Sequence, residues 1–299
     1  MSAPRERLRI GIQKSGRLAD RSLALLSKAG VNFDLRKDRL LHASPDFPID
    51  LMLVRDDDIP AYVNDGVCDL GIVGENAVQE AIWAAPVRHG HGVTKLQGLG
   101  FGACRLVIAV PERLPFEGLA SLRGARVATS YPNCLNRLST EEGLELECIQ
   151  LAGSVEIAPG LGIADAVCDL VSTGGTLRSN GLREVFTLFE TEAVLLRTER
   201  ALPAEMERDL ARLALRLKGV TRAANAKYVM MNAPRSALER IQQVIPGMES
   251  PTVIPLSGDG DRVAIHAVAY EEIFWETLET LQACGASSIL VLPIEKVIA

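Results

Sequence analysis

The sequence predicts an α/β protein in which two lobes of similar build face one cleft and a smaller C-terminal domain follows. Three observations predict this organisation. Short apolar runs alternate with helical patterns along most of the chain, two segments of the first two thirds repeat each other, and the C-terminal part has a different order of elements. Alternating strands and helices form parallel sheets, whose ligands bind beyond the carboxyl ends of the strands.

The composition is that of a globular protein. A length of 299 residues suits two or three domains. An apolar content of 47% and a charged content of 23% are ordinary for a globular protein. No apolar run approaches the ~18 residues of a membrane span, and the start MSAPRERLRIGI has no signal-peptide core. The net charge of −6 argues against a nucleic-acid partner. Six cysteines without a CxxC pair predict reduced thiols, so we expect a cytoplasmic protein with no membrane partner.

An internal repeat supports the two lobes. The string Val67–Gly74 matches Val167–Gly174 at an offset of a hundred residues, and a fainter match pairs Leu8–Ile12 with Ala125–Thr129. In each half an apolar strand runs into a polar turn, and a later strand ends in a glycine turn. Because both matches occur in the same order, each half is expected to fold as one lobe with its strand ends at the cleft.

The two lobes are expected to divide the chain unequally. Lobe I comprises residues 1–103 and 183–224. In the second of these ranges, a strand from Glu184 to Leu196 brings the chain back to lobe I, and a helix from Met206 to Leu217 packs over that strand. Lobe II comprises residues 104–182. This layout with two crossovers resembles the periplasmic-binding-protein fold.

Residues 225–299 form the third expected domain. Their predicted order, βαββαβ, is that of a ferredoxin-like unit. The domain carries no evident catalytic set and is interpreted as a ligand-sensing or assembly module. Its predicted strands cover residues 228–231, 252–256, 262–269 and 288–294, its helices run through residues 238–245 and 274–281, and a turn falls at Gly258-Asp259-Gly260.

The most informative segment is EIAPGLGIADAVCDLVSTGGTL, from Glu156 to Leu177. An apolar strand there leads into Ser172-Thr173-Gly174-Gly175-Thr176, small residues whose amides and hydroxyls suit a phosphate. The helix expected next would present its positive end to the same anion. Glu156 and Asp169 stand upstream, where carboxylates could accept the hydroxyls of a sugar that carries the phosphate. On pattern alone, a plain strand–turn–helix junction explains the glycines equally well.

The segment matches the signature of the ATP phosphoribosyltransferase family in Glu156, Gly162, Ala164, Asp169-Leu170 and Thr173-Gly174-Gly175-Thr176-Leu177. The chain resembles that family over essentially its whole length. Further matching strings are QKSGRL at 13–18, VRDDDIP at 54–60, DLGIVGEN at 69–76, ATSYP at 128–132 and GASSILVLPIEK at 285–296.

The resemblance implies a pentosyltransferase of histidine biosynthesis. Such an enzyme transfers the phosphoribosyl group of phosphoribosyl pyrophosphate to N1 of ATP and releases pyrophosphate, with Mg²⁺ held mainly by substrate phosphates. Positioning and charge stabilisation carry such a transfer, so no certain catalytic residue and no certain protein metal ligand is assigned. The resemblance further implies feedback inhibition by L-histidine at residues 225–299, no separate regulatory subunit, and a homo-oligomer, a hexamer built from dimers with the dimer as the active form.

The resemblance also distributes roles among the site residues. The 5′-phosphate is expected on Thr173, Gly174, Gly175 and Thr176, with Ser172 and Leu177 beside them, and the ribose hydroxyls on Glu156 and Asp169. Thr252 and Ser288 are the expected histidine contacts. The other expected substrate contacts are Lys14, Ser15, Gly16, Arg17, Arg55, Glu75, Asn76, Arg105 and Tyr131.

Some of these residues have plainer explanations. Asp169 matches Asp69 in the repeat, so one of the two could be a shared feature of the fold. Asp56-Asp57-Asp58 before Pro60 is interpreted as a helix start, with an acidic N-cap, rather than a magnesium site. His89-Gly90-His91 is interpreted as a solvated loop rather than a metal pair, in a stretch to which no role is assigned, residues 84–97.

Three other classes of protein fit parts of the sequence. A solute-binding protein for transport would share the two lobes, but the missing signal peptide disfavours it and the phosphate loop would be unexplained. A prephenate dehydratase would also join two lobes to a regulatory domain, but it needs no phosphate loop. A sensor that binds both ligands without turnover differs from an enzyme only in an assay.

Overall fold

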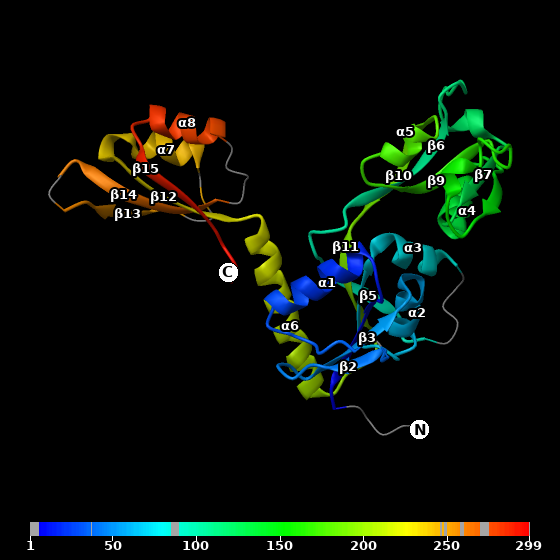
Figure 1. Ribbon diagram of the computed structural model, residues 1–299, viewed down its shortest axis with the longest axis horizontal. Helices are drawn as coiled ribbons and strands as arrows, with labels where there is room; N and C mark the ends of the chain where they lie inside the picture. The colour runs from blue at the N-terminus through cyan, green and yellow to red at the C-terminus, as the bar shows by residue number, and fades with distance from the viewer. Residues whose placement is uncertain are drawn as a thin grey trace. The chain divides into compact units, whose positions relative to one another are not determined.

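The chain is divided between two units, Met1–Ala211 and Arg212–Ala299. A computed structural model describes residues 6–36, 38–84, 90–245, 247, 250–257, 260–269 and 275–298. Unit 1 contains two sheets and unit 2 contains one (Figure 1). The division falls inside one long helix, α6 (Ala204–Ala224). No helix among the described residues is long and apolar enough to span a bilayer.

A mixed six-stranded sheet forms the core of lobe I. Its strands lie in the order β2-β3-β1-β4-β11-β5, and the first three helices pack against it. Alternation places Leu8, Ile10 and Ile12 of the first strand in the core, where all three are fully buried. The elements are β1 (Leu8–Gln13), α1 (Arg17–Lys28), β2 (Leu41–Ala43), β3 (Ile49–Val54), α2 (Ile59–Asn64), β4 (Leu70–Gly74), α3 (Glu75–Trp83), β5 (Val93–Gly98) and β11 (Ala193–Thr198).

Lobe II is built on a five-stranded sheet in the order β10-β6-β9-β7-β8. Its parallel strands β7, β8 and β9 carry the connections of an α/β lobe, while β6 runs antiparallel to both of its neighbours. The expected α/β class is therefore confirmed in both lobes. The elements are β6 (Cys104–Pro111), β7 (Arg126–Thr129), α4 (Pro132–Glu141), β8 (Glu147–Gln150), β9 (Ala166–Val171), α5 (Gly175–Ser179) and β10 (Leu182–Thr191).

The return from lobe II to lobe I lies later in the chain than the sequence predicts. Residues Leu182–Thr191 pair with β6 and so belong to the sheet of lobe II, and only Ala193–Thr198 pairs with β4 and β5 of lobe I. The single strand predicted from Glu184 to Leu196 is therefore two strands of different sheets. An apolar run shows that a strand is buried but not which strand it pairs with, so the sequence could not divide it.

The repeat is real, but its register differs from the sequence match. In lobe I, Ile10 lies beside Leu70, and in lobe II the corresponding Val127 lies beside Ala166. Leu70 thus corresponds to Ala166, at an offset of 96 residues, rather than to Leu170. The predicted offset of a hundred residues is therefore wrong for this strand pair.

In the structural register, Asp69 corresponds to Asp165 and not to Asp169. The backbone N–H of Arg9 donates to Asp69 at 2.9 Å, and that of Arg126 donates to Asp165 at 3.0 Å. Each aspartate N–H donates back to the carbonyl of the same arginine at 2.8 Å. This reciprocal pair is the shared feature of the fold, and Asp169 has no part in it.

Side chains of α3 and α4 join the two lobes. The carboxylate of Glu80 accepts the backbone N–H groups of Asn133 and Cys134 at 2.8 and 2.9 Å, at the start of α4. The guanidinium of Arg137 lies 4.5 Å from the ring centre of Trp83. A helix start is normally capped by a residue of its own chain segment, so Glu80 supplies from lobe I a cap that lobe II lacks.

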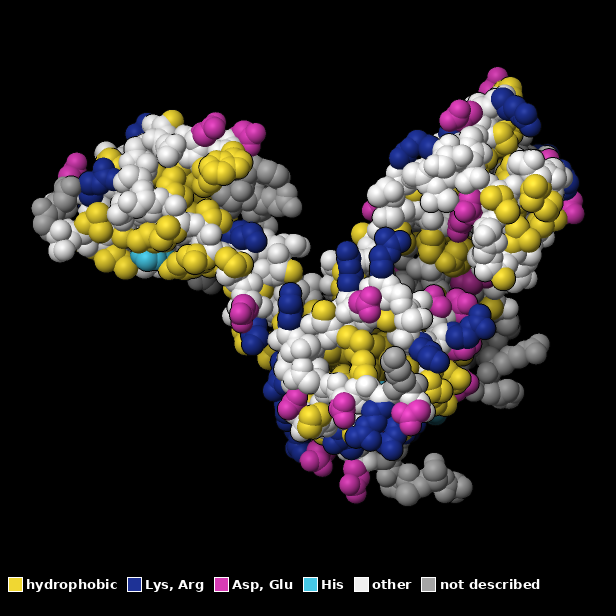
Figure 2. Space-filling view, viewed as in Figure 1, with side chains coloured by type: hydrophobic (Ala, Val, Ile, Leu, Met, Phe, Trp, Pro, Cys, Tyr) yellow, Lys and Arg dark blue, Asp and Glu magenta, His cyan; other side chains and the backbone are white. Residues whose placement is uncertain are grey.

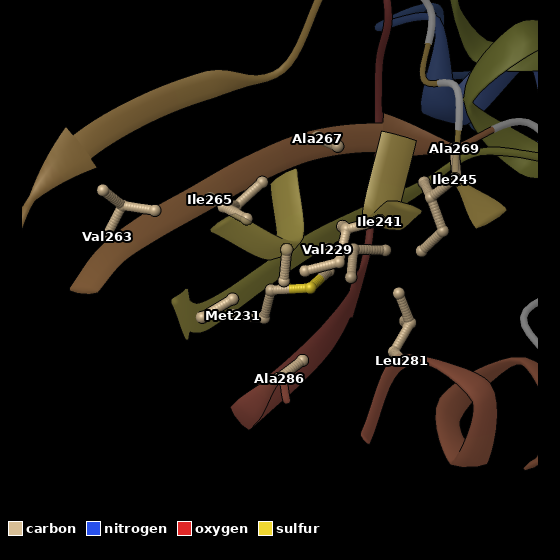
Figure 3. Packing of buried hydrophobic residues seen from close by; sticks show 12 residues of the cluster. Val229, Met231, Ile241, Ile245, Val263, Ile265, Ala267, Ala269, Leu281 and Ala286 are labelled. Carbon is tan, nitrogen blue, oxygen red and sulfur yellow. The ribbon is translucent and has the colours of Figure 1, made fainter. Parts of the chain in front are cut away.

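Unit 2 has the expected βαββαβ order. Its antiparallel sheet, in the order β13-β14-β12-β15, is that of a ferredoxin-like domain. Figure 3 shows Val229 and Ile265 of the sheet packing toward Ile241 and Leu281 of the two helices. The elements are β12 (Lys227–Pro234), α7 (Leu238–Val244), β13 (Thr252–Pro255), β14 (Arg262–Ala269), α8 (Trp275–Ala283) and β15 (Ser287–Pro293).

The other face of this sheet is apolar and open. Tyr228, Ile254, Leu290 and Leu292 are all exposed by more than a third. Figure 2 shows apolar side chains along the side of unit 2 that β13 and β14 form. The predicted turn at Gly258-Asp259 and the first residue of the predicted helix 274–281 lie outside the described residues.

Candidate functional site

The predicted phosphate loop lines a cavity of about 250 Å³ in unit 1. Strand β9 carries the chain into this cavity, and the loop from Ser172 to Thr176 forms one wall. Glu156, Asp169 and, from lobe I, Arg17 complete the lining. The structure therefore brings together four parts of the predicted site that the sequence separates by up to 160 residues.

The loop depends on a glycine at its centre. Gly174 has a φ of +74°, in the left-handed region that side chains disfavour. The helix that follows, α5, has only five residues, and so its dipole is short. The predicted helix does begin at the loop, at Gly175, but its five residues give only a weak positive end. The loop itself offers its backbone amides and the exposed side chains of Ser172, Thr173 and Thr176.

The two carboxylates of the cavity influence each other. Burial raises the pKa of Asp169, and the charge of Glu156 raises it further. Asp169 accepts the N–H of Leu170 at 2.8 Å, which partly offsets this effect. A carboxylate that lines a cavity and has a pKa raised by burial and by a neighbouring charge is typical of functional sites, where such groups bind or react with a ligand. Asp169 is thus free of the fold role that Asp69 and Asp165 share.

One of the two basic residues that follow β1, Arg17, lines the same cavity. Lys14, Ser15, Gly16 and Arg17 form an exposed turn before α1, and the guanidinium-bearing Arg17 lines the cavity. The N–H of Lys14 donates to the carbonyl of Val54 at 2.8 Å, which places Arg55 next to this turn. Arg55 is exposed, and its expected contact with substrate stays a prediction. This edge of lobe I is cationic and suits an anionic substrate.

A second cavity, of about 480 Å³, lies where the chain crosses between the lobes. It shares Ser172 with the first cavity and is lined by the predicted Glu75 and Arg105. Both are already paired, because Lys95 Nζ lies 2.8 Å from Glu75 and Arg105 Nη2 lies 2.7 Å from Glu184. The remaining lining residues are Ala103, Cys104, Glu190, Thr191 and Glu192.

Tyr131 and Asn76 meet between the lobes. The amide of Asn76 donates to the Tyr131 hydroxyl at 3.2 Å. Burial, reinforced by the negative charge of Asp169, raises the pKa of Tyr131 well above its usual range. The phenol therefore stays protonated and acts as a neutral hydrogen-bonding group.

The acidic run before Pro60 forms a helix start. Asp56–Asp58 make one 3-10 turn that leads into α2, but Asp58 makes no side-chain capping bond, so the expected N-cap is not formed. Burial and the charge of Asp56 raise the pKa of Asp57. Within the described residues, no group of three or more His, Cys, Asp or Glu side chains is arranged to hold a metal ion. His89 of the predicted solvated loop lies outside the described residues.

The two expected histidine contacts lie on opposite edges of one sheet. Thr252 begins β13 and Ser288 lies in β15, which are separated by β14 and β12. Three strand spacings amount to roughly 14 Å. One small ligand cannot reach both residues of a single chain. Ser288 has a φ of +51°, an uncommon conformation for serine.

Sequence reasoning missed three residues that shape the site. Glu80 caps α4 from another lobe, and Glu184 and Arg178 lie against the phosphate loop. Arg178 follows the loop motif by two residues and could have been considered with it. Glu80 and Glu184 give no local signal, because their partners are 53 and 79 residues away.

Comparison with known proteins identifies the family. The model of the ATP phosphoribosyltransferase family matches residues 55–219, and the model of the HisG C-terminal domain matches residues 223–296. A chain of the ATP phosphoribosyl transferase (HisG:HisZ) complex from Thermotoga maritima is 28% identical and has a TM-score of 0.59, over 71% of this chain and 98% of that one. The aliphatic sulphonate binding protein SsuA of Escherichia coli is 20% identical and has a TM-score of 0.46, over 73% and 74%.

The two family models together match residues 55–219 and 223–296. The first alone covers more than half of the chain, and the phosphate loop of lobe II lies inside it. The protein therefore belongs to the ATP phosphoribosyltransferase family, pentosyltransferases of histidine biosynthesis, and carries that family's C-terminal domain.

Proposed function

We propose that the protein joins phosphoribosyl pyrophosphate to N1 of ATP and releases pyrophosphate. The observation that carries the proposal is the single cavity in which the loop Ser172–Thr176, Glu156, Asp169 and Arg17 meet. A ribose that carries a phosphate needs amide donors at one end and carboxylate acceptors at its hydroxyls. The cavity supplies both, and Arg17 adds a cation for a second phosphate group.

The residues divide the work by their chemistry. Thr173, Gly174, Gly175 and Thr176 bind the 5′-phosphate, and Glu156 and Asp169 accept the ribose hydroxyls. The basic turn Lys14–Arg17 and Arg55 bind the pyrophosphate or the triphosphate. The protein thereby aligns the attacking ring nitrogen with the ribose C1 and stabilises the departing charge, which needs no covalent nucleophile.

Mg²⁺ belongs to the substrates in this proposal. We infer that the ion arrives on the substrate phosphates, because Mg²⁺ is usually bound by one or two carboxylates together with substrate phosphates rather than by an all-protein cage. Such an ion would neutralise part of the pyrophosphate charge. The chain's own proposed contribution is the basic turn Lys14–Arg17 and the loop Ser172–Thr176, which hold the phosphates in place.

Unit 2 is proposed to bind L-histidine and to inhibit the enzyme. Because Thr252 and Ser288 lie on opposite sheet edges, one histidine touches both only if two copies of the domain meet edge to edge. The open apolar face with Tyr228, Ile254 and Leu290 supports a homo-oligomer, for which we propose a hexamer built from dimers, with the dimer as the active form. Inhibition then requires histidine to favour a less active arrangement of this assembly.

Two further expectations belong to the proposal. Residues 1–103 and 183–224 form catalytic lobe I in this proposal, except that the strand ending at Thr191 lies in the sheet of lobe II. Residues 104–182 form catalytic lobe II, and residues 225–299 form the regulatory domain. The relative from Thermotoga maritima is a complex of two kinds of chain. Because the present chain carries its own C-terminal domain, we propose that it works without a second kind of subunit, in the cytoplasm.

The test is product formation from ATP, phosphoribosyl pyrophosphate and Mg²⁺, followed by ultraviolet absorbance with and without L-histidine. Turnover that histidine suppresses supports both parts of the proposal, and turnover without suppression refutes the regulatory part. Thr176→Ala and Asp169→Ala should lose most turnover, whereas Thr140→Ala, an exposed threonine on α4, should retain it. Absence of turnover in the wild type would refute the catalytic proposal.

A further inference from the structure

We propose that Arg105, Glu184 and Arg178 form a clamp behind the phosphate loop, which turns the loop's amides toward the bound phosphate. We call these three residues the loop clamp. They act through the loop and not on substrate, and so they are positioning residues. The inference rests on the proposed function of Thr173–Thr176 as the 5′-phosphate site.

The first half of the clamp is a two-pronged ion pair on neighbouring strands. Arg105 of β6 donates from Nε to a Glu184 oxygen at 2.9 Å and from Nη2 to both oxygens at 2.7 and 2.9 Å. The side chains are 34% and 26% exposed. A bidentate pair of this kind holds one geometry, because both planar groups are fixed at two points.

The two arginines each hold a carbonyl of the loop. Arg105 Nη1 donates to the carbonyl of Ser172 at 3.3 Å, and Arg178 Nη2 donates to that of Thr173 at 3.1 Å. In a trans peptide the carbonyl and the next N–H point in opposite directions. The N–H groups of Thr173 and Gly174 are therefore turned away from the arginines. These are amides that the phosphate requires.

The missing side chain of Gly174 supplies an independent observation. A Cβ at this position would lie 2.7 Å from Glu184 Oε1 and 2.9 Å from Arg178 Nη1. The carboxylate of Glu184 and the guanidinium of Arg178 therefore lie directly beside the backbone of Gly174, in the space that a side chain would need. With two arginines and one glutamate, the clamp carries a net positive charge behind the loop, which favours a doubly negative phosphate in front of it.

The clamp assigns Arg105 a different role from the direct substrate contact that the family resemblance implies. Nε, Nη1 and Nη2 of Arg105 all donate to protein acceptors. A guanidinium engaged in this way is held in place and has little capacity left for a substrate. Its effect on the phosphate must pass through the loop.

The experiment compares Glu184→Gln with Asp50→Asn. Asp50 pairs with Arg7 at 2.8 Å, with side chains 21% and 38% exposed, and so it matches Glu184 in burial but lies outside the site. Glu184→Gln should raise the KM for phosphoribosyl pyrophosphate about tenfold, which corresponds to about 1.4 kcal/mol. The KM for ATP and the Tm should stay within the range of Asp50→Asn. A KM for phosphoribosyl pyrophosphate within twofold of the wild type would overturn the clamp.

Two further comparisons guard the test against misfolding and against a direct role of Arg105. Arg178 is exposed and can be changed with little risk to the fold. Arg178→Gln should also raise the KM for phosphoribosyl pyrophosphate, and Arg178→Lys should recover part of this loss. Arg105→Lys combined with Glu184→Gln should be no worse than either alone, because both break one unit. Full additivity would overturn the clamp and support direct contact.

Calorimetric titration separates failure of the clamp from failure of the proposed function. Wild type that binds phosphoribosyl pyrophosphate without turnover refutes the proposed reaction, and the tenfold loss of binding in Glu184→Gln still tests the clamp. Wild-type turnover with unchanged binding in Glu184→Gln refutes the clamp alone. Wild type that does not bind this substrate refutes both.

Discussion

Two aspartates at equivalent positions of the two lobes should differ sharply in their contribution to stability. Asp69 and Asp165 each accept the backbone N–H of an arginine at the start of a lobe. Asp69 is fully buried and pairs with Arg200 Nη2 at 2.6 Å. The side chain of Asp165 is 45% exposed, and Arg126 lies 2.9 Å away. Burial is thus the main difference between the two positions.

Asp69→Ala should lower the free energy of unfolding of unit 1 by about 3–5 kcal/mol. Two hydrogen bonds to a buried charge are lost, at roughly 1.5–3 kcal/mol each, and the N–H of Arg9 keeps no acceptor. Asp165→Ala should cost only a small fraction of this, because water replaces the lost partner. For a slope of roughly 2 kcal/mol per molar urea, the midpoint of Asp69→Ala falls by about 2 M.

The assay is urea unfolding followed by tryptophan fluorescence. The chain has two tryptophans, Trp83 in α3 and Trp275 in α8, so each unit contains one. In a Trp275→Phe background, which alters a side chain that is 79% exposed, the signal reports unit 1 alone. Equal shifts of the midpoint in Asp69→Ala and Asp165→Ala would refute the argument from burial.

Three further predictions concern the site. Between pH 3.8 and the raised pKa of Asp169, the folded protein keeps a proton that the unfolded chain has lost, so the stability of the fold falls as the pH rises through this window. In calorimetry, Asp169→Asn should therefore have a higher Tm than the wild type near neutral pH and the same Tm below pH 3.8. The variant should still lose activity. Gly174→Ala should lower the turnover of phosphoribosyl pyrophosphate and reduce the free energy of unfolding, measured in urea, by about 1–2 kcal/mol. Gly175→Ala should keep the Tm of the wild type, because the added Cβ would contact only the Thr173 hydroxyl, at 3.8 Å. Glu80→Gln should speed amide exchange at the start of α4 about 5- to 30-fold in mass spectrometry, for the loss of about 1–2 kcal/mol of capping, and unchanged exchange there would contradict the cap.

The local features of the site could be predicted from the sequence because they depend on neighbours along the chain. The glycine turn after an apolar strand, the two upstream carboxylates and the basic turn after the first strand all lie within short segments. Strand and helix periods likewise predicted the βαββαβ order of unit 2, which its sheet confirms. The roles of the site residues themselves stay predictions.

Pairing between distant segments could not be predicted. The repeated string VCDL predicted that Asp69 and Asp169 are equivalent, but strand register makes Asp165 the partner and leaves Asp169 to the cavity. One strand was predicted from Glu184 to Leu196, but this segment is divided between two strands of different sheets.

By itself, the sequence determined the fold class, the family motifs and the position of the glycine turn between β9 and α5, since apolar period and turn chemistry act over a few residues. Only the tertiary structure decided which charges meet: Glu184 with Arg105 behind the loop, and Glu80 at the start of α4. Such pairs form when sheets and lobes assemble, so their energy depends on burial and on distances between segments that are far apart in the chain.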